Sequence, residues 1–446
     1  MSDNSIPQGD TRRAFLRKAA IGVAAGATSA SVMPTTAAAM QRIIGANDRI
    51  QIGHVGLGGQ GMTHVRLLKQ NAQDNLKNNT ESIAVCDLYV RRKKEAQQFL
   101  GLADAAAYDD FRRLVERPDL DCVWVTTSDQ WHADVAMAAM DAGKHVYCEK
   151  PMCKTVEQAY AMHATAKRTK RVVQIGVQSC TDLKWHVAGD AVRSGRIGHT
   201  VMGQGSYCRN SKEGEWNYYT IDPDASPHAT GDGYVNWDLF RRGVEPAAWD
   251  PDRFFRWRKY WEYGSGILGD LFPHRLHPLM IALAQPQDGF EGFPIHVASL
   301  GGLYVQKINP VTHKPDREVP DFTNIIVDMK DECSIMLLGT VINEIGWQDM
   351  VRGNKATIYF GGDGVEIKPE RIWSDEVEGG VLPVGGPGED IAAHERNFLD
   401  AVRTNGIPNC NIDLGLRVQI MISLGELSYR HRKEYTFDPE TRRVSA

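Results

Sequence analysis

Short apolar runs alternate with helix-like stretches between residues 49 and 176. The apolar runs predict β-strands at residues 50–55, 82–86, 122–126, 145–148 and 172–175. Between them, apolar residues recur every three to four positions, which predicts helices that include residues 62–68, 133–140 and 155–167. Strands that alternate with helices in this way are typical of a doubly wound parallel sheet.

After Gly176 the pattern changes to longer strand-like segments with few helices between them. The segments that predict strands are residues 201–207, 297–305, 323–329, 334–340 and 356–360, and a closing helix is expected at 390–402. This pattern favours an open, mostly antiparallel sheet. The sequence therefore predicts an α/β protein in which a doubly wound parallel sheet is followed by a second α/β domain.

The chain begins with the three parts of an export signal. Arg12 and Arg13 precede an apolar, alanine-rich run at residues 19–27, and small residues follow at 37–39. Paired arginines in this position are typical of twin-arginine signals, and the apolar run is far too short to span a bilayer. We therefore expect a signal at residues 1–39 and a periplasmic or otherwise exported protein. An uncleaved membrane anchor is the alternative.

Without residues 1–39 the chain is long enough for two domains, which we place at residues 40–175 and 176–446. The leader holds four of the 51 basic and two of the 56 acidic side chains, so the remainder has a net charge of about −7. This charge argues against nucleic acid or an anionic membrane as a partner, and no other apolar stretch could cross a bilayer. None of the eight cysteines forms a Cys-x-x-Cys pair, so we expect mostly free thiols that bind no metal.

A glycine-rich turn follows the first predicted strand and opens the first helix. Gly56 allows a tight turn, Gly58 lets the backbone approach a pyrophosphate, and Gly61 permits close packing of helix on strand. The helix N-terminus offers unpaired N–H groups to phosphate. Asp87 ends the next strand, where it can bind the ribose hydroxyls, and this favours NAD. The basic residues 91–94 leave NADP open as the alternative.

Two further motifs carry a family resemblance. Residues 129–151 read DQWHADVAMAAMDAGKHVYCEKP, and residues 269–274 read GDLFPH. With the glycine turn, they resemble the Gfo/Idh/MocA-type oxidoreductases, which include sugar and polyol oxidoreductases and certain NAD-dependent glycosidases. The resemblance covers nearly the whole chain after the leader. It implies a Rossmann domain, then an α/β domain whose sheet forms subunit contacts, and hence a homo-oligomer, either a dimer or a tetramer.

The resemblance also implies that Lys150, Asp270 and His274 match the family's catalytic lysine, aspartate and histidine. Beyond the glycine turn and Asp87, the expected cofactor contacts are Thr127, His132, Glu149, Lys150 and Gln178. The sequence departs from the family at Ser128, where proline is common, and at Phe272-Pro273, where many members have glycine and a small residue.

Oxidation of an alcohol needs a hydride acceptor, a base for the hydroxyl proton and a cation near the developing alkoxide. NAD would supply the hydride acceptor. The imidazole of His274, titrating near neutrality, would be the base, and Lys150 would be the cation. If a helix begins near Asp270, its carboxylate and His274 share a face and can form a hydrogen bond. A helix N-cap and a buried structural histidine are the alternative. Only His277 could add a third ligand, so no metal site is expected.

The combined prediction is an NAD(P)-dependent oxidoreductase that acts on a sugar or glycoside hydroxyl. Because an exported enzyme cannot exchange spent cofactor with a cytoplasmic pool, we expect the cofactor to be tightly bound and recycled within the cycle. Three alternatives stay open: a glycosidase or lyase that works by transient ring oxidation, a plain sugar or polyol dehydrogenase with exchanging NAD, and a cofactor-binding scaffold without turnover. The loop-rich residues 216–261 hold five of the ten tryptophans, which could stack on a sugar or anchor loops.

Overall fold

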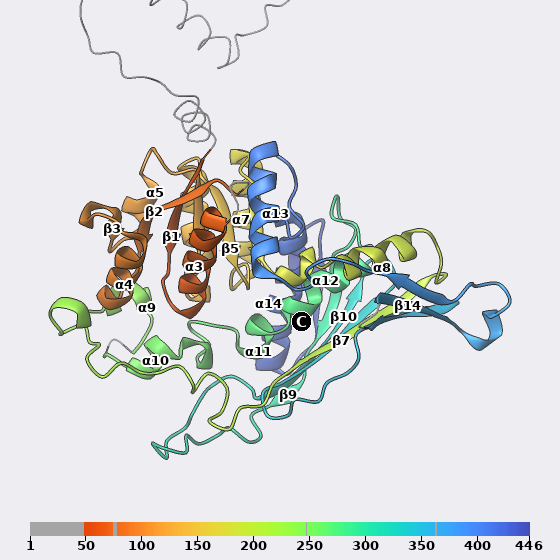
Figure 1. Ribbon diagram of the computed structural model, residues 1–446. Helices are drawn as coiled ribbons and strands as arrows, with labels where there is room; N and C mark the ends of the chain where they lie inside the picture. The colour runs from red at the N-terminus through yellow and green to blue at the C-terminus, as the bar shows by residue number, and fades with distance from the viewer. Residues whose placement is uncertain (1–48, 75–77, 247, 362–363) are drawn as a thin grey trace, which may run out of the picture. The chain divides into compact units, whose positions relative to one another are not determined.

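The structure is a computed structural model that describes residues 49–74, 78–246, 248–361 and 364–446 (Figure 1). The export signal expected at residues 1–39 lies outside the described residues, so it stays a prediction. No helix within the described ranges is long and apolar enough to span a bilayer.

A six-stranded parallel sheet forms the first part of the fold, with the strand order β3-β2-β1-β4-β5-β6. Its strands are β1 (Ile50–Val55), β2 (Thr80–Cys86), β3 (Ala107–Tyr108), β4 (Cys122–Val125), β5 (His145–Glu149) and β6 (Val173–Gly176). The order reverses between β1 and β4, and in such sheets ligands bind at the carboxyl ends of the strands beside that point. The predicted doubly wound sheet is confirmed.

Helices cover both faces of this sheet (Figure 1). They are α3 (Gly59–Asp74), α4 (Val90–Leu100), α5 (Phe111–Val115), α6 (Asp129–Asp141) and α7 (Val156–Thr169). A late element also packs here, because Phe398 of α13 (Ile391–Thr404) lies edge-on to the stacked rings of Trp124 and Tyr147. A helix from late in the chain therefore adds to the core of the first sheet, and the domain boundary at residue 175 stays a prediction.

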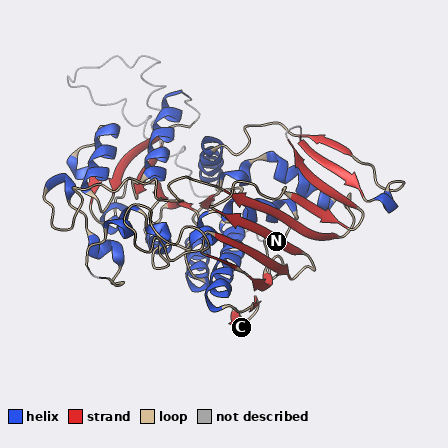
Figure 2. Cartoon of the chain, turned by 90° about the horizontal axis from the view of Figure 1, so that it is seen from below, coloured by secondary structure: helices blue, strands red, loops and turns tan. Residues whose placement is uncertain are grey.

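The second sheet has eleven strands and is mixed but mostly antiparallel, as expected (Figure 2). Its order is β15-β14-β13-β12-β7-β11-β10-β8-β16-β17, with β9 on β10. Among the described pairs of this second sheet, only β7–β11 is parallel. The strands are β7 (Thr200–Cys208), β8 (Pro294–Ala298), β9 (Gly301–Gly302), β10 (Phe322–Met329), β11 (Ser334–Thr340), β12 (Met350–Gly353), β13 (Ala356–Gly361), β14 (Gly364–Pro369), β15 (Gly380–Pro383), β16 (Tyr435–Asp438) and β17 (Arg443–Ser445).

One strand prediction was wrong in extent. The strand expected at residues 297–305 ends at Ala298, and only Gly301–Gly302 pair again, as β9. The backbone N–H groups of residues 304–306 instead donate to the carboxylate of Asp321, at 2.7 to 2.8 Å. A side chain that satisfies three successive N–H groups turns the chain away from the ladder.

Several helices of the second part were not expected. They are α8 (Leu183–Arg193), α9 (Trp237–Arg241), α10 (Pro251–Phe255), α11 (Gly266–Asp270) and α14 (Ile412–His431). The helix considered near Asp270 is present as α12 (Pro273–Ala282), which begins three residues later. Single 3-10 turns lie at Asp104–Ala106 in the first part and at Gln178–Thr181, Gly231–Gly233, Trp257–Lys259 and Arg371–Trp373 in the second. Helix α14 is the largest omission. It is buried on nearly all sides, so it lacks the one-sided apolar stripe by which a surface helix is recognised. The closing helix predicted at 390–402 is confirmed as α13.

All eight cysteines, which lie in the described part of the chain, are free thiols, as expected.

Candidate active site

A cleft of about 980 Å³ opens at the carboxyl ends of β1, β2 and β4, and the glycine turn lines it. Gly56 has a φ of 91°, and a Cβ at Gly61 would lie 2.1 Å from the carbonyl oxygen of Gly56, so both positions need glycine. Gly58 is more open, because the atom nearest to a Cβ there is a nitrogen of Arg92 at 3.8 Å. This leaves room for phosphate against the turn and the N-terminus of α3, so the residues fit a dinucleotide.

Asp87 lies at the end of β2, lines the cleft and is buried. Its carboxylate accepts hydrogen bonds from the backbone N–H of Leu57 (2.6 Å) and of Tyr89 (2.8 Å). These bonds fix the carboxylate at the cleft, where its remaining lone pairs can bind ribose hydroxyls.

The four basic residues after Asp87 have different surroundings. Arg92 lines the cleft, with its guanidinium over the rings of Phe254 and Phe255 at 5.6 and 5.3 Å from the centroids. The other three form ion pairs with carboxylates. Arg91 pairs with Asp222 and Asp224, Lys93 pairs with Asp109, and Lys94 pairs with Asp232.

Of the other expected cofactor contacts, Thr127 lines the cleft. Within the described residues the lining does not include His132, Glu149, Lys150 or Gln178, the last of which begins the 3-10 turn after β6. The ring nitrogens of His132 contact the carbonyl oxygens of Pro151 (2.6 Å) and Thr127 (3.1 Å). Burial lowers the pKa of His132. Since a neutral imidazole has a single N–H, His132 can donate to only one of these two carbonyl oxygens.

Lys150 and Asp270 form an ion pair. Nζ of Lys150 lies 2.7 Å from Oδ1 of Asp270 and 2.8 Å from its carbonyl oxygen. Two further donors hold the same carboxylate, since the indole N–H of Trp216 bonds Oδ2 and Nε of Arg258 bonds Oδ1, each at 3.0 Å. Burial alone would raise the pKa of Asp270, but Lys150 and Arg258 hold it well below its usual range. The carboxylate is therefore ionised and fixes the position of the lysine ammonium.

His274 lies in the first turn of α12, buried, with its ring 5.2 Å from that of Tyr207. Its Nδ1 is buried and has no hydrogen-bond partner among the described residues. Burial, with help from the Lys150 ammonium, lowers the pKa of His274 to about 3, so the expectation that it titrates near neutrality was wrong. The neutral imidazole can accept a hydrogen bond from a hydroxyl group.

The expected hydrogen bond between Asp270 and His274 was also wrong. In the described structure the donors to the Asp270 carboxylate are Lys150, Trp216 and Arg258. Helix α11 ends at Asp270 and α12 begins only at Pro273, so the two residues belong to different helices and a spacing of four does not place them on one face.

Glu149, next to Lys150, belongs to a buried network that the sequence did not reveal. His64 of α3 contacts Glu149 through Nε2 (3.0 Å) and Glu395 of α13 through Nδ1 (2.7 Å). Burial alone would lower the pKa of His64, but hydrogen bonds and charge from the two carboxylates raise it to about 9. Burial alone would raise the pKa of Glu149, yet His64 and Lys150 lower it to about 2. The imidazolium thus ties the glycine-turn helix to the strand end that carries Lys150.

Residues 216–261, of which 247 is not described, extend across the cleft, and we call them the cover segment. In Figure 1 its helix α9 lies beside α4 of the first sheet. Seven of the residues that line the cleft come from it: Tyr219, Leu239, Phe240, Phe254, Phe255, Trp257 and Arg258. Of its tryptophans, Trp216 binds Asp270, Trp257 lines the cleft, and Trp237 and Trp249 pack edge-to-face in an aromatic cluster.

The cover segment contacts one rim of the cleft just after β2. There the backbone N–H of Val90 donates to Tyr234 O (3.1 Å) and that of Asn236 to Leu88 O (2.9 Å). The ion pair of Arg91 with Asp222 and a hydrogen bond of 2.5 Å from Tyr89 Oη to Asp222 add to this contact.

The second contact lies on the opposite rim, at the start of α6. The carbonyl oxygen of Phe240 accepts hydrogen bonds from the side chains of Gln130 (3.2 Å) and Trp131 (3.1 Å). Arg242 pairs with Asp134 at 2.5 Å. The segment is therefore attached on both sides of the cleft.

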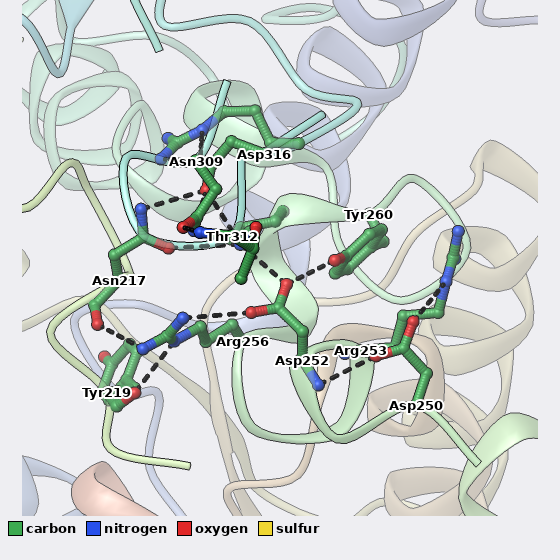
Figure 3. Close-up of polar contacts among 12 residues, drawn as sticks. Asn217, Tyr219, Asp250, Asp252, Arg253, Arg256, Tyr260, Asn309, Thr312 and Asp316 are labelled. Atoms are coloured by element: carbon green, nitrogen blue, oxygen red, sulfur yellow. Dashed lines mark hydrogen bonds and ion pairs between the residues drawn. The ribbon is translucent and has the colours of Figure 1, made fainter. Parts of the chain in front are cut away.

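A polar network fixes the base of the cover segment (Figure 3). Arg256 donates to the carbonyl oxygens of Asn217 (2.7 Å) and Tyr219 (2.9 Å) and pairs with Asp252 (3.1 Å). Asp252 also pairs with the buried Lys259 at 2.7 Å. The cover segment is thus held by hydrogen bonds and ion pairs within the segment, in addition to its contacts with the two rims of the cleft.

The first part of the chain has relatives of known family. Residues 50–177 match the Gfo/Idh/MocA family, described as an oxidoreductase family with an NAD-binding Rossmann fold. Inositol 2-dehydrogenase of Salmonella paratyphi B is 33% identical over 168 residues, which are 37% of this chain and 48% of that protein. A glycosyl hydrolase family 109 protein of Porphyromonas gingivalis is 30% identical over 180 residues, 39% of this chain and 37% of that protein. The chain thus spans about half the length, or less, of these two curated relatives.

Solved structures extend the likeness of the fold to most of the chain. Levoglucosan dehydrogenase in complex with NADH and levoglucosan superposes with a TM-score of 0.64 at 18% identity, over 86% of this chain and 98% of that one. Aldose–aldose oxidoreductase of Caulobacter crescentus, complexed with glycerol, superposes with a TM-score of 0.60 at 18% identity, over 87% and 100%. Residues 50–177 therefore match the NAD-binding Rossmann domain of the Gfo/Idh/MocA oxidoreductases, and over most of the chain the likeness to the solved structures is one of fold.

Proposed function

We propose that this protein oxidises a hydroxyl group of a carbohydrate with an NAD that stays bound and is recycled within each catalytic cycle. The cover segment is the observation that carries the proposal, because it lines the cleft and is attached to both rims. Contacts at both rims would slow the release of a dinucleotide from the cleft. The sugar and polyol substrates in the names of the similar proteins support a carbohydrate as substrate.

Bound NAD would supply the hydride acceptor. The chain's own residues meet the other needs. The ammonium of Lys150, fixed by Asp270, can donate a hydrogen bond to the developing alkoxide oxygen. The neutral imidazole of His274 can accept the hydrogen bond of the substrate hydroxyl and orient it.

Recycling requires two substrates. One carbohydrate gives up a hydride and a proton and becomes a carbonyl compound, and a second carbonyl compound takes both back and becomes an alcohol. Export by the signal expected at residues 1–39 would make such a closed cycle necessary, since a cofactor loaded in the cytoplasm could not be replaced outside it.

Nucleotide retention tests the proposal. Protein purified without added nucleotide should release about one NAD(H) per chain on denaturation. The double variant Asp222→Ala/Arg242→Ala opens one ion pair on each rim and should release the nucleotide about tenfold faster, because a partly exposed ion pair contributes up to about 1 kcal/mol. Release is measured by repeated gel filtration and absorbance.

The control for this experiment is Arg193→Ala, which removes an exposed ion pair with Asp190 in α8, outside the cleft lining. It should retain nucleotide like the wild type. A wild-type protein that is isolated empty and turns over only with added NAD would instead be a plain dehydrogenase, and the recycling proposal would be rejected.

Trp216→Phe is expected to lower kcat about tenfold or more, since a hydrogen bond to a charged group contributes roughly 1.5–3 kcal/mol. The variant keeps a buried ring but removes the N–H that holds Asp270 Oδ2. Loss of this donor raises the pKa of Asp270, so the acid limb of the pH–rate profile should move to higher pH. Trp185→Phe is the control, because its indole is buried and its N–H has no partner among the described residues. Equal profiles of the two variants would contradict a positioning role for Trp216.

A further inference from the structure

A second, wide-open hollow lies beside His274 at the end of β7. One wall includes Tyr207, whose ring lies 5.2 Å from that of His274, and Arg275, the residue after it. The other wall is the loop after β11, with residues 344 and 346–349. The hollow shares no lining residue with the dinucleotide cleft, so it is a separate space that adjoins the candidate catalytic histidine.

Both arginines of the wall already have carboxylate partners. Arg209 pairs with Glu215 at 3.2 Å, and Arg275 pairs with Asp349 and Glu389 at 3.1 Å each. Glu344 lies in the same wall and has no ion pair in the described part of the chain. A carboxylate or phosphate on the ligand would face this acidic group and two arginines that are already paired. The hollow therefore fits an uncharged ligand.

Trp347 gives the hollow an exposed aromatic surface, with 45% of the residue accessible. Its loop is fixed on β7, because Oγ of Ser206 donates to Trp347 O (2.8 Å) and Nε2 of Gln204 donates to Gln348 O (3.2 Å). An exposed indole on this anchored loop, beside hydroxyl, amide and carboxylate groups, suits a ligand with apolar C–H faces and many hydroxyls. Among uncharged ligands, a sugar ring has this combination.

We propose that this hollow binds a second sugar ring, so that the substrate is an uncharged disaccharide or longer glycoside rather than a single sugar, a sugar acid or a sugar phosphate. The ring to be oxidised lies at Lys150 and His274, and the next ring lies against Trp347. This inference rests on the proposed function and adds the substrate class to it.

The test measures binding and cofactor reduction separately on the purified holoenzyme. Glucose, cellobiose, maltose and glucuronate are titrated in by calorimetry, and reduction of the bound nucleotide is followed by absorbance. We expect cellobiose or maltose to bind more tightly than glucose and glucuronate. Trp347→Ala should weaken binding of that disaccharide about tenfold or more and leave binding of glucose unchanged. Trp373→Ala, outside both cavities, is the control.

The outcomes separate this inference from the proposed function. One outcome is that a disaccharide binds in a way that depends on Trp347 while the bound nucleotide is not reduced. That result would support the subsite and contradict the proposed oxidation. The subsite would be overturned by equal weakening of glucose and disaccharide, by tighter binding of glucuronate, or by binding of neither disaccharide. A changed molecular mass of the Trp347→Ala variant in solution would also overturn it, because the hollow would then be a subunit interface.

Discussion

Replacement of Lys150 by methionine is expected to lower turnover about a thousandfold, in the range lost when a positioned acid–base or charge-stabilising group is removed. Methionine keeps much of the length of the side chain but removes the ammonium that lies 2.7 Å from Asp270. The glycine turn, Asp87 and the cover segment are untouched, so the bound nucleotide should stay in place. Steady-state turnover with a carbohydrate substrate and nucleotide released on denaturation are measured on the same preparation.

Lys167→Met is the matched control, because that lysine is half exposed and pairs with Asp413 in α14. It should leave turnover and nucleotide content unchanged. Asp270 keeps the donors Trp216 and Arg258 in the Lys150 variant, so the fold should persist, as a thermal unfolding curve would show. Near-normal turnover of Lys150→Met would remove this lysine from the mechanism, while loss of nucleotide together with turnover would point to a role in cofactor binding instead.

Replacement of His64 by leucine is expected to destabilise the protein by about 3–5 kcal/mol at pH 6, the usual cost of removing one partner of a buried ion pair. The imidazolium of His64 contacts Glu149 and Glu395 in a buried site. Leucine would remove this cation from both carboxylates, although Glu149 would keep the hydrogen bond from Gln60. The free energy of unfolding is measured by urea denaturation. His163→Leu is the control, because the His163–Asp413 pair is partly exposed and should contribute less than about 1 kcal/mol.

The pKa of His64 also predicts a pH dependence of the wild type. The folded pKa of about 9 lies above the usual value of 6.5, so the folded state holds a proton that the unfolded state has lost between these two pH values. The stabilisation is therefore fully present below pH 6.5 and is lost as the pH rises through about 9. Urea denaturation at pH 6, 7.5 and 9.5 should show this decline. A wild-type stability that stays level over this range would show that His64 is not protonated between its carboxylates.

The first sheet and its cofactor turn were predictable because they depend on short-range patterns. Apolar strand runs separated by helices specify a parallel sheet, and Gly56, Gly58 and Gly61 follow the first strand at fixed spacing. The motif that contains Lys150 ends β5, as expected. These features need only local sequence, since a strand and the turn after it are neighbours along the chain.

Helix α14 and the loop around Asp321 were not predictable in the same way. The helix is buried on nearly every side, so tertiary packing replaces the amphipathic pattern on which a sequence-based prediction relies. Three backbone N–H groups at residues 304–306 turn to the carboxylate of Asp321, which lies 15 to 17 positions later in the chain. A β-like sequence there does not form a strand because a side chain satisfies its N–H groups.

By itself, the sequence determined the kind of fold, the cofactor turn and the residue types at the candidate catalytic positions. Only the tertiary structure decided what those residues contact: Asp270 bonds Lys150 and Trp216, which lie 120 and 54 positions away, rather than His274, four positions away. It also decided that residues 216–261 cover the cleft and that His64 joins two distant carboxylates. The physical reason is the same in each case, since burial and hydrogen bonding select partners by position in space, and a two-residue break between α11 and α12 is enough to change them.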